Sequence, residues 1–335
     1  MEKVKMSCSE TGAQLLARLG SRPDISKVEP ILFPMGLKGK DVLELYGSEG
    51  CGKTEMLLHI ACSLILPKTW RGWNFGGCGA SLIFIDTDYK FSILRLVTLL
   101  EKRITHFVEH NQQVTLSENS EATFNPTSRD IEVVIKESLE RLNVLQCKSS
   151  LQLLATLHSL EARISTNPDI CVIMIDSISA FYWLDRCTGG ESVTAQETVM
   201  NLIVDILSHL VNDYNLVLLA TKSAYFKRKV KESEKGDCIG ILDMDHSEFL
   251  SRNWSRFVKH RLILKKDVNS SNAVQFSVNS SSWQKKTRRL TDWTLPGGAR
   301  VGPQIPTKGP TGTMTERAVM LPWTPPRTLG MPLSR

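Results

Sequence analysis

One short segment has residue types and spacing that can bind a phosphate group. The spacing G-x-x-x-x-G-K-T of a phosphate-binding loop is filled by Gly47, Ser48, Glu49, Gly50, Cys51, Gly52, Lys53 and Thr54. A chain that wraps a phosphate needs positive φ angles and little side-chain bulk, which glycine provides. Lys53 would reach the β- and γ-phosphates of ATP and the Thr54 hydroxyl would ligate Mg²⁺. A glycine-rich turn with an incidental lysine is the alternative.

A carboxylate about 120 residues further along the chain is a candidate for the magnesium ligand of such a site. The apolar run 171–175 ends in Asp176, which is followed by Ser177. A carboxylate at the end of a buried strand is the group that holds Mg²⁺ and its water beside the γ-phosphate. An Asp-Ser pair is also typical of an ordinary helix cap. Together with the upstream loop, the pattern favours Asp176 as a magnesium ligand.

Short apolar runs alternate with longer amphipathic stretches between residues 39 and 283, and these elements must position the two motifs. Because the strand runs are continuous rather than alternating, we expect strands that are covered on both faces. The order of the elements predicts an α/β fold with a mostly parallel, twisted sheet flanked by helices. The expected strands are 42–46, 82–86, 143–147, 171–176, 216–221 and 261–265. The expected helices are 53–66, 91–107, 151–164 and 193–211, and the polar stretch 109–130 is expected to be an irregular insertion loop.

Composition divides the 335 residues into three parts. Residues 1–38 carry one helical pattern, 9–19, and then several prolines, which is too little for an independent domain. Residues 284–335 contain nine basic and two acidic residues with eight of the 14 prolines, so we expect a disordered basic tail. The rest of the chain is close to neutral, although the whole chain carries a formal charge of +6. The core domain is therefore predicted at 39–283.

The remaining composition excludes some classes of protein. No apolar run reaches the roughly 18 residues that a membrane span needs, so no membrane association is expected. The eight cysteines are scattered and contain no Cys-x-x-Cys pair, which argues against a zinc ribbon and favours reduced thiols in the nucleus or cytosol.

Several segments together resemble the core of the RecA-type strand-exchange recombinases. The stretch from Ile173 to Tyr182, the strand end Phe84-Ile-Asp-Thr-Asp88, the run Leu218–Thr221 and the late strand 260–265 carry the resemblance. It covers roughly residues 10–280 and is closest to one of the family's DNA-repair paralogues. The resemblance implies a RecA-like P-loop core, and the chain has no room for the helix-hairpin-helix domain of the main eukaryotic recombinases.

Two positions depart from the pattern of an efficient ATPase in that family. The catalytic acid is usually Glu, whereas position 88 is Asp, one methylene shorter. The polar glutamine sensor aligns best with Ser223, beside Lys222, which we expect to be a solvated strand-end lysine. Because a general base must lie within hydrogen-bond reach of the attacking water, we expect ATP binding with slow or absent hydrolysis. Asp88 as the cap of the helix near Phe91 is an equal alternative.

The resemblance also implies partners and a location. Such a chain would be the ATP-binding subunit of a multi-paralogue complex that assists homologous recombination at DNA breaks and stalled forks in the nucleus. The N-terminal helix is a candidate docking element, with packing on its own domain as the alternative. Single-stranded or branched DNA would be contacted through loops that include the basic residues Lys227, Arg228, Lys229 and Lys231, although acidic residues follow closely.

Other functions remain open from the sequence. One is an active DNA-dependent ATPase that performs strand exchange alone, and another is a structural adaptor with a vestigial phosphate-binding loop. A small-molecule P-loop kinase would need an arginine-rich lid, and the sequence near the site has no suitable cluster.

Overall fold

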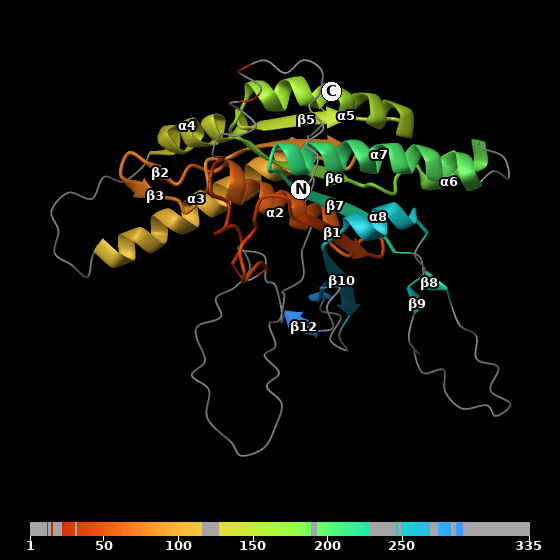
Figure 1. The fold of residues 1–335 in the computed structure, drawn as a ribbon. Coiled ribbons are helices and arrows are strands. Elements are labelled where there is room, and N and C mark those ends of the chain that lie inside the picture. The colour runs from red at the N-terminus through yellow and green to blue at the C-terminus, as the bar shows by residue number, and fades with distance from the viewer. Residues whose placement is uncertain are drawn as a thin grey trace, which may run out of the picture.

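The computed structural model describes residues 22–30, 32–115, 127–188, 193–224, 249–268, 274–282 and 286–290, and the short pieces 12, 15, 226–227 and 245–246. At its centre lies one eight-stranded sheet with the order β12-β11-β10-β1-β7-β6-β4-β5 (Figure 1). The six strands from β10 to β5 are mutually parallel, and β11 and β12 continue the sheet antiparallel. This confirms the predicted α/β fold with a mostly parallel sheet.

The strand and helix bounds follow the predicted pattern to within a few residues for most elements. The strands of the large sheet are β1 (Val42–Gly47), β4 (Ser81–Asp86), β5 (Leu142–Gln146), β6 (Ile170–Asp176), β7 (Val217–Ser223), β10 (His260–Val268), β11 (Val274–Ser282) and β12 (Lys286–Leu290). Two further two-stranded antiparallel sheets are formed by β2 (Thr69–Trp70) with β3 (Trp73–Asn74) and by β8 (Phe226–Lys227) with β9 (Asp245–His246). The helices are α2 (Lys53–Ile65), α3 (Ile93–Thr115), α4 (Ser128–Leu139), α5 (Ser150–Thr166), α6 (Tyr182–Thr188), α7 (Val193–Asp213) and α8 (Arg252–Phe257).

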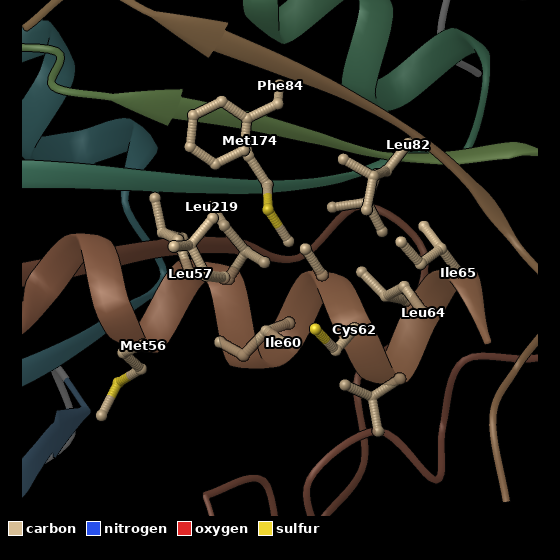
Figure 2. Packing of buried hydrophobic residues seen from close by; sticks show 14 of the residues in the cluster. Met56, Leu57, Ile60, Cys62, Leu64, Ile65, Leu82, Phe84, Met174 and Leu219 are labelled. Atoms are coloured by element: carbon tan, nitrogen blue, oxygen red, sulfur yellow. The ribbon is translucent and has the colours of Figure 1, made fainter. Parts of the chain in front are cut away.

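Each central strand contributes to two separate hydrophobic cores, one on each face of the sheet. In β4, Leu82 and Phe84 pack with α2, α3 and α4, whereas Ile83 and Ile85 pack with α5, α7 and α8. Figure 2 shows the first core, where side chains of α2 meet those of β4, β6 and β7. Because successive strand residues point to opposite faces and both faces are covered, the strand sequences are continuously apolar.

The prediction of an irregular loop over residues 109–130 is wrong at both ends. Helix α3 continues to Thr115, and α4 begins at Ser128. The start of α4 is fixed by a reciprocal capping box between Thr127 and Asp130, a signal that the polar composition of this stretch concealed. Residues 116–126 lie outside the described part of the chain.

The segment before β1 packs on the core rather than standing apart from it. Its apolar side chains Ile25, Val28, Leu32, Phe33 and Leu37 are buried in the core on the α2 and α3 side. The guanidinium of Arg22 donates hydrogen bonds to the main-chain carbonyls of Pro168, Ile170 and Tyr214, at the amino ends of β6 and β7. These bonds fix where the N-terminal segment joins the domain. Of the predicted helix 9–19, only positions 12 and 15 are described, and both are helical.

At the other end, β12 pairs with β11, so the sheet includes residues 286–290 beyond the expected boundary at residue 283. The rest of the predicted tail lies outside the described residues. Among the helices that the structure describes, none is long and apolar enough to cross a membrane. Six cysteines in the described part are free thiols, namely Cys51, Cys62, Cys78, Cys147, Cys171 and Cys187.

Candidate nucleotide-binding site

The phosphate-binding loop lies between β1 and α2, at the carboxyl end of the parallel strands. Gly50 and Gly52 have φ angles of +71° and +89°, the left-handed region that glycine adopts without strain. A Cβ at Gly47 would come within 2.5 Å of the Leu264 carbonyl oxygen on β10, so only glycine fits there. The loop then leads directly into α2 at Lys53, with Gly52 as a helix cap that makes no side-chain bond. The first turn of a helix presents N–H groups that lack partners within the helix, which suits a bound anion.

Lys53 is bonded to the loop itself in this structure. Its ammonium group donates hydrogen bonds to the carbonyl oxygens of Gly47, at 2.8 Å, and Ser48, at 2.7 Å. Burial lowers the pKa of Lys53 because the charged form loses water around it. The lysine therefore holds the loop in shape and lies where an incoming phosphate can take over its hydrogen bonds.

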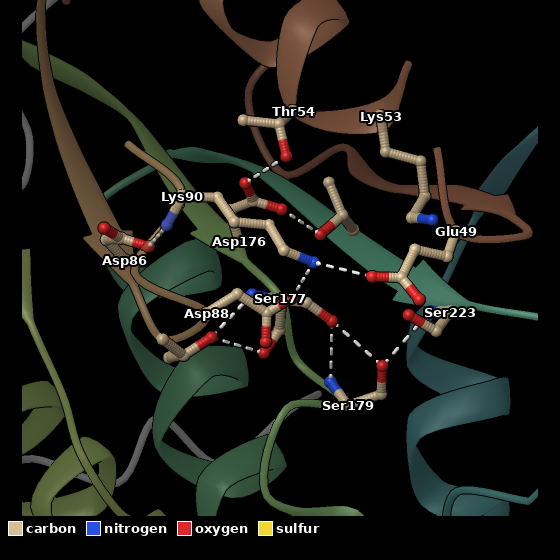
Figure 3. Close-up of polar contacts among 12 residues, drawn as sticks. Glu49, Lys53, Thr54, Asp86, Asp88, Lys90, Asp176, Ser177, Ser179 and Ser223 are labelled. Carbon is tan, nitrogen blue, oxygen red and sulfur yellow. Dashed lines mark hydrogen bonds and ion pairs between the residues drawn. The ribbon is translucent and has the colours of Figure 1, made fainter. Parts of the chain in front are cut away.

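Thr54 and Asp176 meet across the site, as a shared magnesium site requires. The Thr54 hydroxyl donates a 2.7 Å hydrogen bond to one carboxylate oxygen of Asp176, and Thr221 on β7 donates to the other (Figure 3). Asp176 is 2% exposed. Burial raises the pKa of Asp176. The hydrogen bonds from the two hydroxyl donors partly oppose this rise, and the negative charges of Asp88 and Asp86 add to it.

A hydroxyl and a carboxylate oxygen at this distance are hard oxygen ligands, which fit Mg²⁺. The described residues contain no group of three or more His, Cys, Asp or Glu side chains that could hold a metal ion alone. An ion held by Thr54 and Asp176 would take its remaining ligands from water and from nucleotide phosphates. Thr221 could not be identified as a site residue from the sequence, because a threonine in an apolar strand gives no signal of its partner.

The turn after β4 brings Asp88 to the same place. The backbone N–H groups of Thr87 and Asp88 donate to the Asp176 carbonyl oxygen, which ties this turn to the end of β6. The carboxylate of Asp86 accepts the N–H groups of Lys90 and Phe91 at 3.1 and 3.2 Å.

The helix that follows this turn is capped by another residue. Ser92 accepts the N–H of Arg95 at 3.3 Å, and α3 begins at Ile93. The alternative that Asp88 caps this helix is therefore wrong. Its carboxylate instead lies 3.3 Å from the ammonium group of Lys90.

A row of small hydroxyl side chains lines the strand ends beside this cluster. The Ser177 and Ser179 hydroxyls lie 2.9 Å apart, and the Ser223 N–H donates to Ser179 at 3.1 Å. The Thr87 hydroxyl donates to the Ser177 carbonyl oxygen at 2.7 Å. Ser223, the expected sensor position, is thus joined to the end of β6 through its backbone, and its side chain has no long polar arm.

The expectation of a solvated Lys222 is wrong. This lysine is 0% exposed, and its ammonium lies 3.9 Å from a carboxylate oxygen of Glu44, which is also 0% exposed. Glu44 further pairs with Arg261 and accepts a 2.6 Å hydrogen bond from the indole of Trp254. Helix α8 and the residues before it cover this end of β7, which the strand pattern alone does not reveal.

Glu55, in the first turn of α2, links the site to α3. Its carboxylate lies 3.0 and 3.1 Å from Nε of Arg95 and 3.6 Å from Nε2 of His59. Burial acts to raise the pKa of Glu55, but the hydrogen bonds and charges of His59 and Arg95 outweigh it and hold the pKa at about 2.

This carboxylate gives a testable pH dependence. Because its folded-state pKa is depressed, its stabilisation is present above the ordinary value near 4.5 and is lost as the pH falls towards about 2. We expect Glu55→Gln to lower the free energy of unfolding by about 1 kcal/mol at pH 6, after solvent screening. In urea titrations the difference from wild type should shrink between pH 4.5 and pH 3. A difference that stays constant over this range would contradict the assignment.

The predicted DNA-contacting residues cannot be placed side by side. Lys227 belongs to the short strand β8, and Arg228, Lys229 and Lys231 lie outside the described residues. Their role stays a prediction.

Comparison with known proteins gives a consistent set of relatives. The chain is 39% identical to the mouse DNA repair protein XRCC2 over 267 residues, which span 77% of this chain and 85% of the mouse protein. It is 29% identical over 289 residues to the DNA repair protein XRCC2 homolog of Arabidopsis thaliana, with 77% of each chain covered. The DNA repair and recombination protein RadA of Methanoculleus marisnigri is 26% identical over 224 residues, 63% of this chain and 59% of RadA. No family model matches the chain.

Proposed function

Because the chain belongs to the XRCC2 family of RecA-type recombinase paralogues, which act in DNA repair by homologous recombination, we propose that it is an ATP-binding subunit of a paralogue complex. The 2.7 Å contact between Thr54 and Asp176 carries this proposal. These residues are 122 positions apart in sequence, and their meeting at the start of α2 is what a magnesium-nucleotide site needs.

In this proposal each part of the site has a separate task. The loop Gly47–Gly52 and the first turn of α2 surround the phosphates with N–H donors, and Lys53 leaves the loop carbonyls for the β- and γ-phosphates. Thr54 and Asp176 would hold Mg²⁺, which would supply positive charge to neutralise the phosphates. Asp88 lies nearby as the candidate base that would orient water.

We expect little or no hydrolysis from this arrangement. The Asp88 side chain is one methylene shorter than the glutamate usual in the family, so it reaches less far towards an attacking water, and Ser223 has no long polar arm. Withdrawal of a base from hydrogen-bond reach costs orders of magnitude in rate.

Titration calorimetry of the full chain with ATP, with and without Mg²⁺, tests the binding, and phosphate release tests the turnover. We expect heat of binding that depends on Mg²⁺, and phosphate release below about one per minute, far under the usual enzyme range. Brisk hydrolysis that Asp88→Asn abolishes would contradict the weak-ATPase part. Absence of binding by folded protein, alone and in its complex, would contradict the ATP-binding part.

A structural adaptor with a vestigial loop is the second candidate, and one observation favours it. Lys53 and Asp176 are satisfied by groups of this chain, namely the loop carbonyls and two threonine hydroxyls. A site that is complete without nucleotide can persist as part of the fold. Assembly of the complex that is independent of ATP and insensitive to Lys53→Ala would support this candidate.

We further propose partners and a location that follow from family membership. Other recombinase paralogues would bind the chain in a hetero-oligomer through the part of residues 1–38 that precedes Arg22, since the side chains from Ile25 to Leu37 pack on their own domain. The core domain would comprise 39–283 together with this packed segment and β12, and the basic tail would follow β12. DNA would be contacted in the nucleus through the complex, with Lys227, Arg228, Lys229 and Lys231 as candidate phosphate contacts.

A further inference from the structure

Lys90 lies at the mouth of the nucleotide site, where no motif predicted a basic residue. Its ammonium group is 3.3 Å from the carboxylate of Asp88 and 3.8 Å from that of Glu49 (Figure 3). Glu49 belongs to the phosphate-binding loop, whereas Asp88 follows β4. The lysine therefore bridges the loop and the acidic turn on the opposite side of the site.

The backbone of Lys90 is held in place, so its side chain is aimed at the site rather than placed there by chance. The Asp86 carboxylate, which is 0% exposed, accepts the Lys90 N–H at 3.1 Å. The preceding residue, Tyr89, adopts a φ of +56°, which closes the turn tightly. A buried acceptor and a tight turn leave only the side-chain torsions of Lys90 free to move.

The present contacts of Lys90 are weak enough to exchange. Its side chain is 50% exposed and that of Glu49 is 90% exposed, so their ion pair is strongly screened by water. The oxygens of a multiply charged phosphate group bind an ammonium group more strongly than one solvent-screened carboxylate does. An anion seated in the loop next to Asp88 would therefore attract Lys90 away from Glu49.

The charges near Lys90 are mainly negative. The carboxylates of Asp88, Glu49 and Asp176 all lie close enough to act on the Lys90 ammonium, and Lys90 and Lys53 lie in the same electrostatic field. Like charges at this range repel appreciably even with partial solvent screening. Without Lys90, the Asp88 carboxylate would oppose the γ-phosphate more than the β-phosphate, because Asp88 is the candidate base and a base that orients the attacking water belongs on the γ-phosphate side.

We propose that Lys90 is a specificity residue that contacts the γ-phosphate, exchanging Asp88 and Glu49 for it, so that the site prefers ATP to ADP. This inference rests on the proposed ATP binding.

The test compares the affinity of three variants for Mg²⁺-ATP, its β,γ-imido analogue and Mg²⁺-ADP by titration calorimetry on the full chain. Lys90→Gln removes the charge, and Lys90→Arg keeps it. Lys102→Gln makes the same charge change at an exposed position of α3 and is the matched control. We expect Lys90→Gln to lower the affinity for ATP and for the analogue about tenfold, and the affinity for ADP less than twofold. This is the effect that loss of one charge-assisted contact to the γ-phosphate implies. Lys90→Arg and Lys102→Gln should stay within about twofold of wild type.

The outcomes separate this inference from the proposed function. Wild type can bind ATP while Lys90→Gln lowers the affinities for ATP and ADP equally, or lowers neither affinity. Either result overturns the assignment of Lys90 to the γ-phosphate and leaves the proposed ATP binding intact. If Lys90→Arg loses affinity as fully as Lys90→Gln, a charge contact is likewise ruled out. If folded wild type binds neither nucleotide, the proposed function fails and the inference fails with it.

Discussion

Replacing Asp176 with asparagine is expected to abolish magnesium-dependent ATP binding while leaving the nucleotide-free fold at least as stable as wild type. The carboxylate is buried, and its burial already disfavours the charged form. Asparagine keeps the shape, and the hydroxyls of Thr54 and Thr221 can donate to its oxygen or accept from its amide. It removes the negative charge and a ligand oxygen that Mg²⁺ needs, so the affinity for Mg²⁺-ATP should fall about 100-fold or more.

Thermal unfolding without nucleotide measures the stability of the Asp176→Asn fold, and thermal unfolding with Mg²⁺-ATP measures whether the variant still binds it. Wild type should gain stability on addition of Mg²⁺-ATP because the ligand binds only the folded state, whereas Asp176→Asn should show no gain. Asp205→Asn, at an exposed position of α7, is the matched control and should behave as wild type. An undiminished ATP-dependent gain in Asp176→Asn would remove this residue from the magnesium site. A fall of several degrees without nucleotide would show that its role is structural.

Removing the charge of Glu44 is expected to be the most destabilising single change in the described core. Its fully buried carboxylate faces Lys222, Arg261 and the indole N–H of Trp254. Loss of one member of a buried ion cluster leaves the partner charges without their counter-charge, at a cost of about 3–5 kcal/mol. That is a large share of the 5–15 kcal/mol by which domains are typically stable. We expect Glu44→Gln to fold poorly at 37 °C and to unfold at markedly lower urea concentration.

A double variant separates charge imbalance from lost packing. Glu44→Gln combined with Lys222→Met removes one charge of each sign, so it should recover most of the stability lost by the single change. Glu132→Gln on α4, which is exposed, is the surface control and should shift the unfolding midpoint very little. A cost below about 1 kcal/mol for Glu44→Gln, or a double variant that is worse than the single one, would contradict this account.

The elements that could be predicted are those in which sequence pattern and burial coincide. The continuous apolar runs of β1, β4, β6 and β7 predicted buried parallel strands, because helices cover both faces of each strand. Helix α4 could not be predicted in the same way, since its buried side chains, Val134, Ile135 and Ser138, are few and its start depends on a polar capping box. Periodicity detects helices with a wide apolar stripe and misses those that bury a narrow one.

Some residues of the candidate site could be predicted from the sequence and others could not. The spacing of the glycine-rich loop predicted the roles of Lys53 and Thr54, and the end of an apolar strand predicted that of Asp176. Lys222 and Lys90 could not be placed, because what surrounds a lysine depends on chain segments far away in sequence. The Phe249 ring lies against Lys222 from beyond the next loop, Trp254 bonds to its partner Glu44, and Glu49 approaches Lys90 from 41 positions earlier. A single sequence does not show which residues far apart along the chain come into contact in the fold.

The anchoring of Arg22 determines what a protein attached to the N-terminal segment can influence. Arg22 is bonded at the amino ends of β6 and β7, whereas Asp176 and Ser223 lie at their carboxyl ends. The seven residues of β6 separate the two places by roughly 23 Å of extended strand. A partner bound upstream of Arg22 would therefore lie at the opposite edge of the sheet from the phosphate-binding loop. Docking of that segment and binding of nucleotide would take place at opposite ends of the same strands.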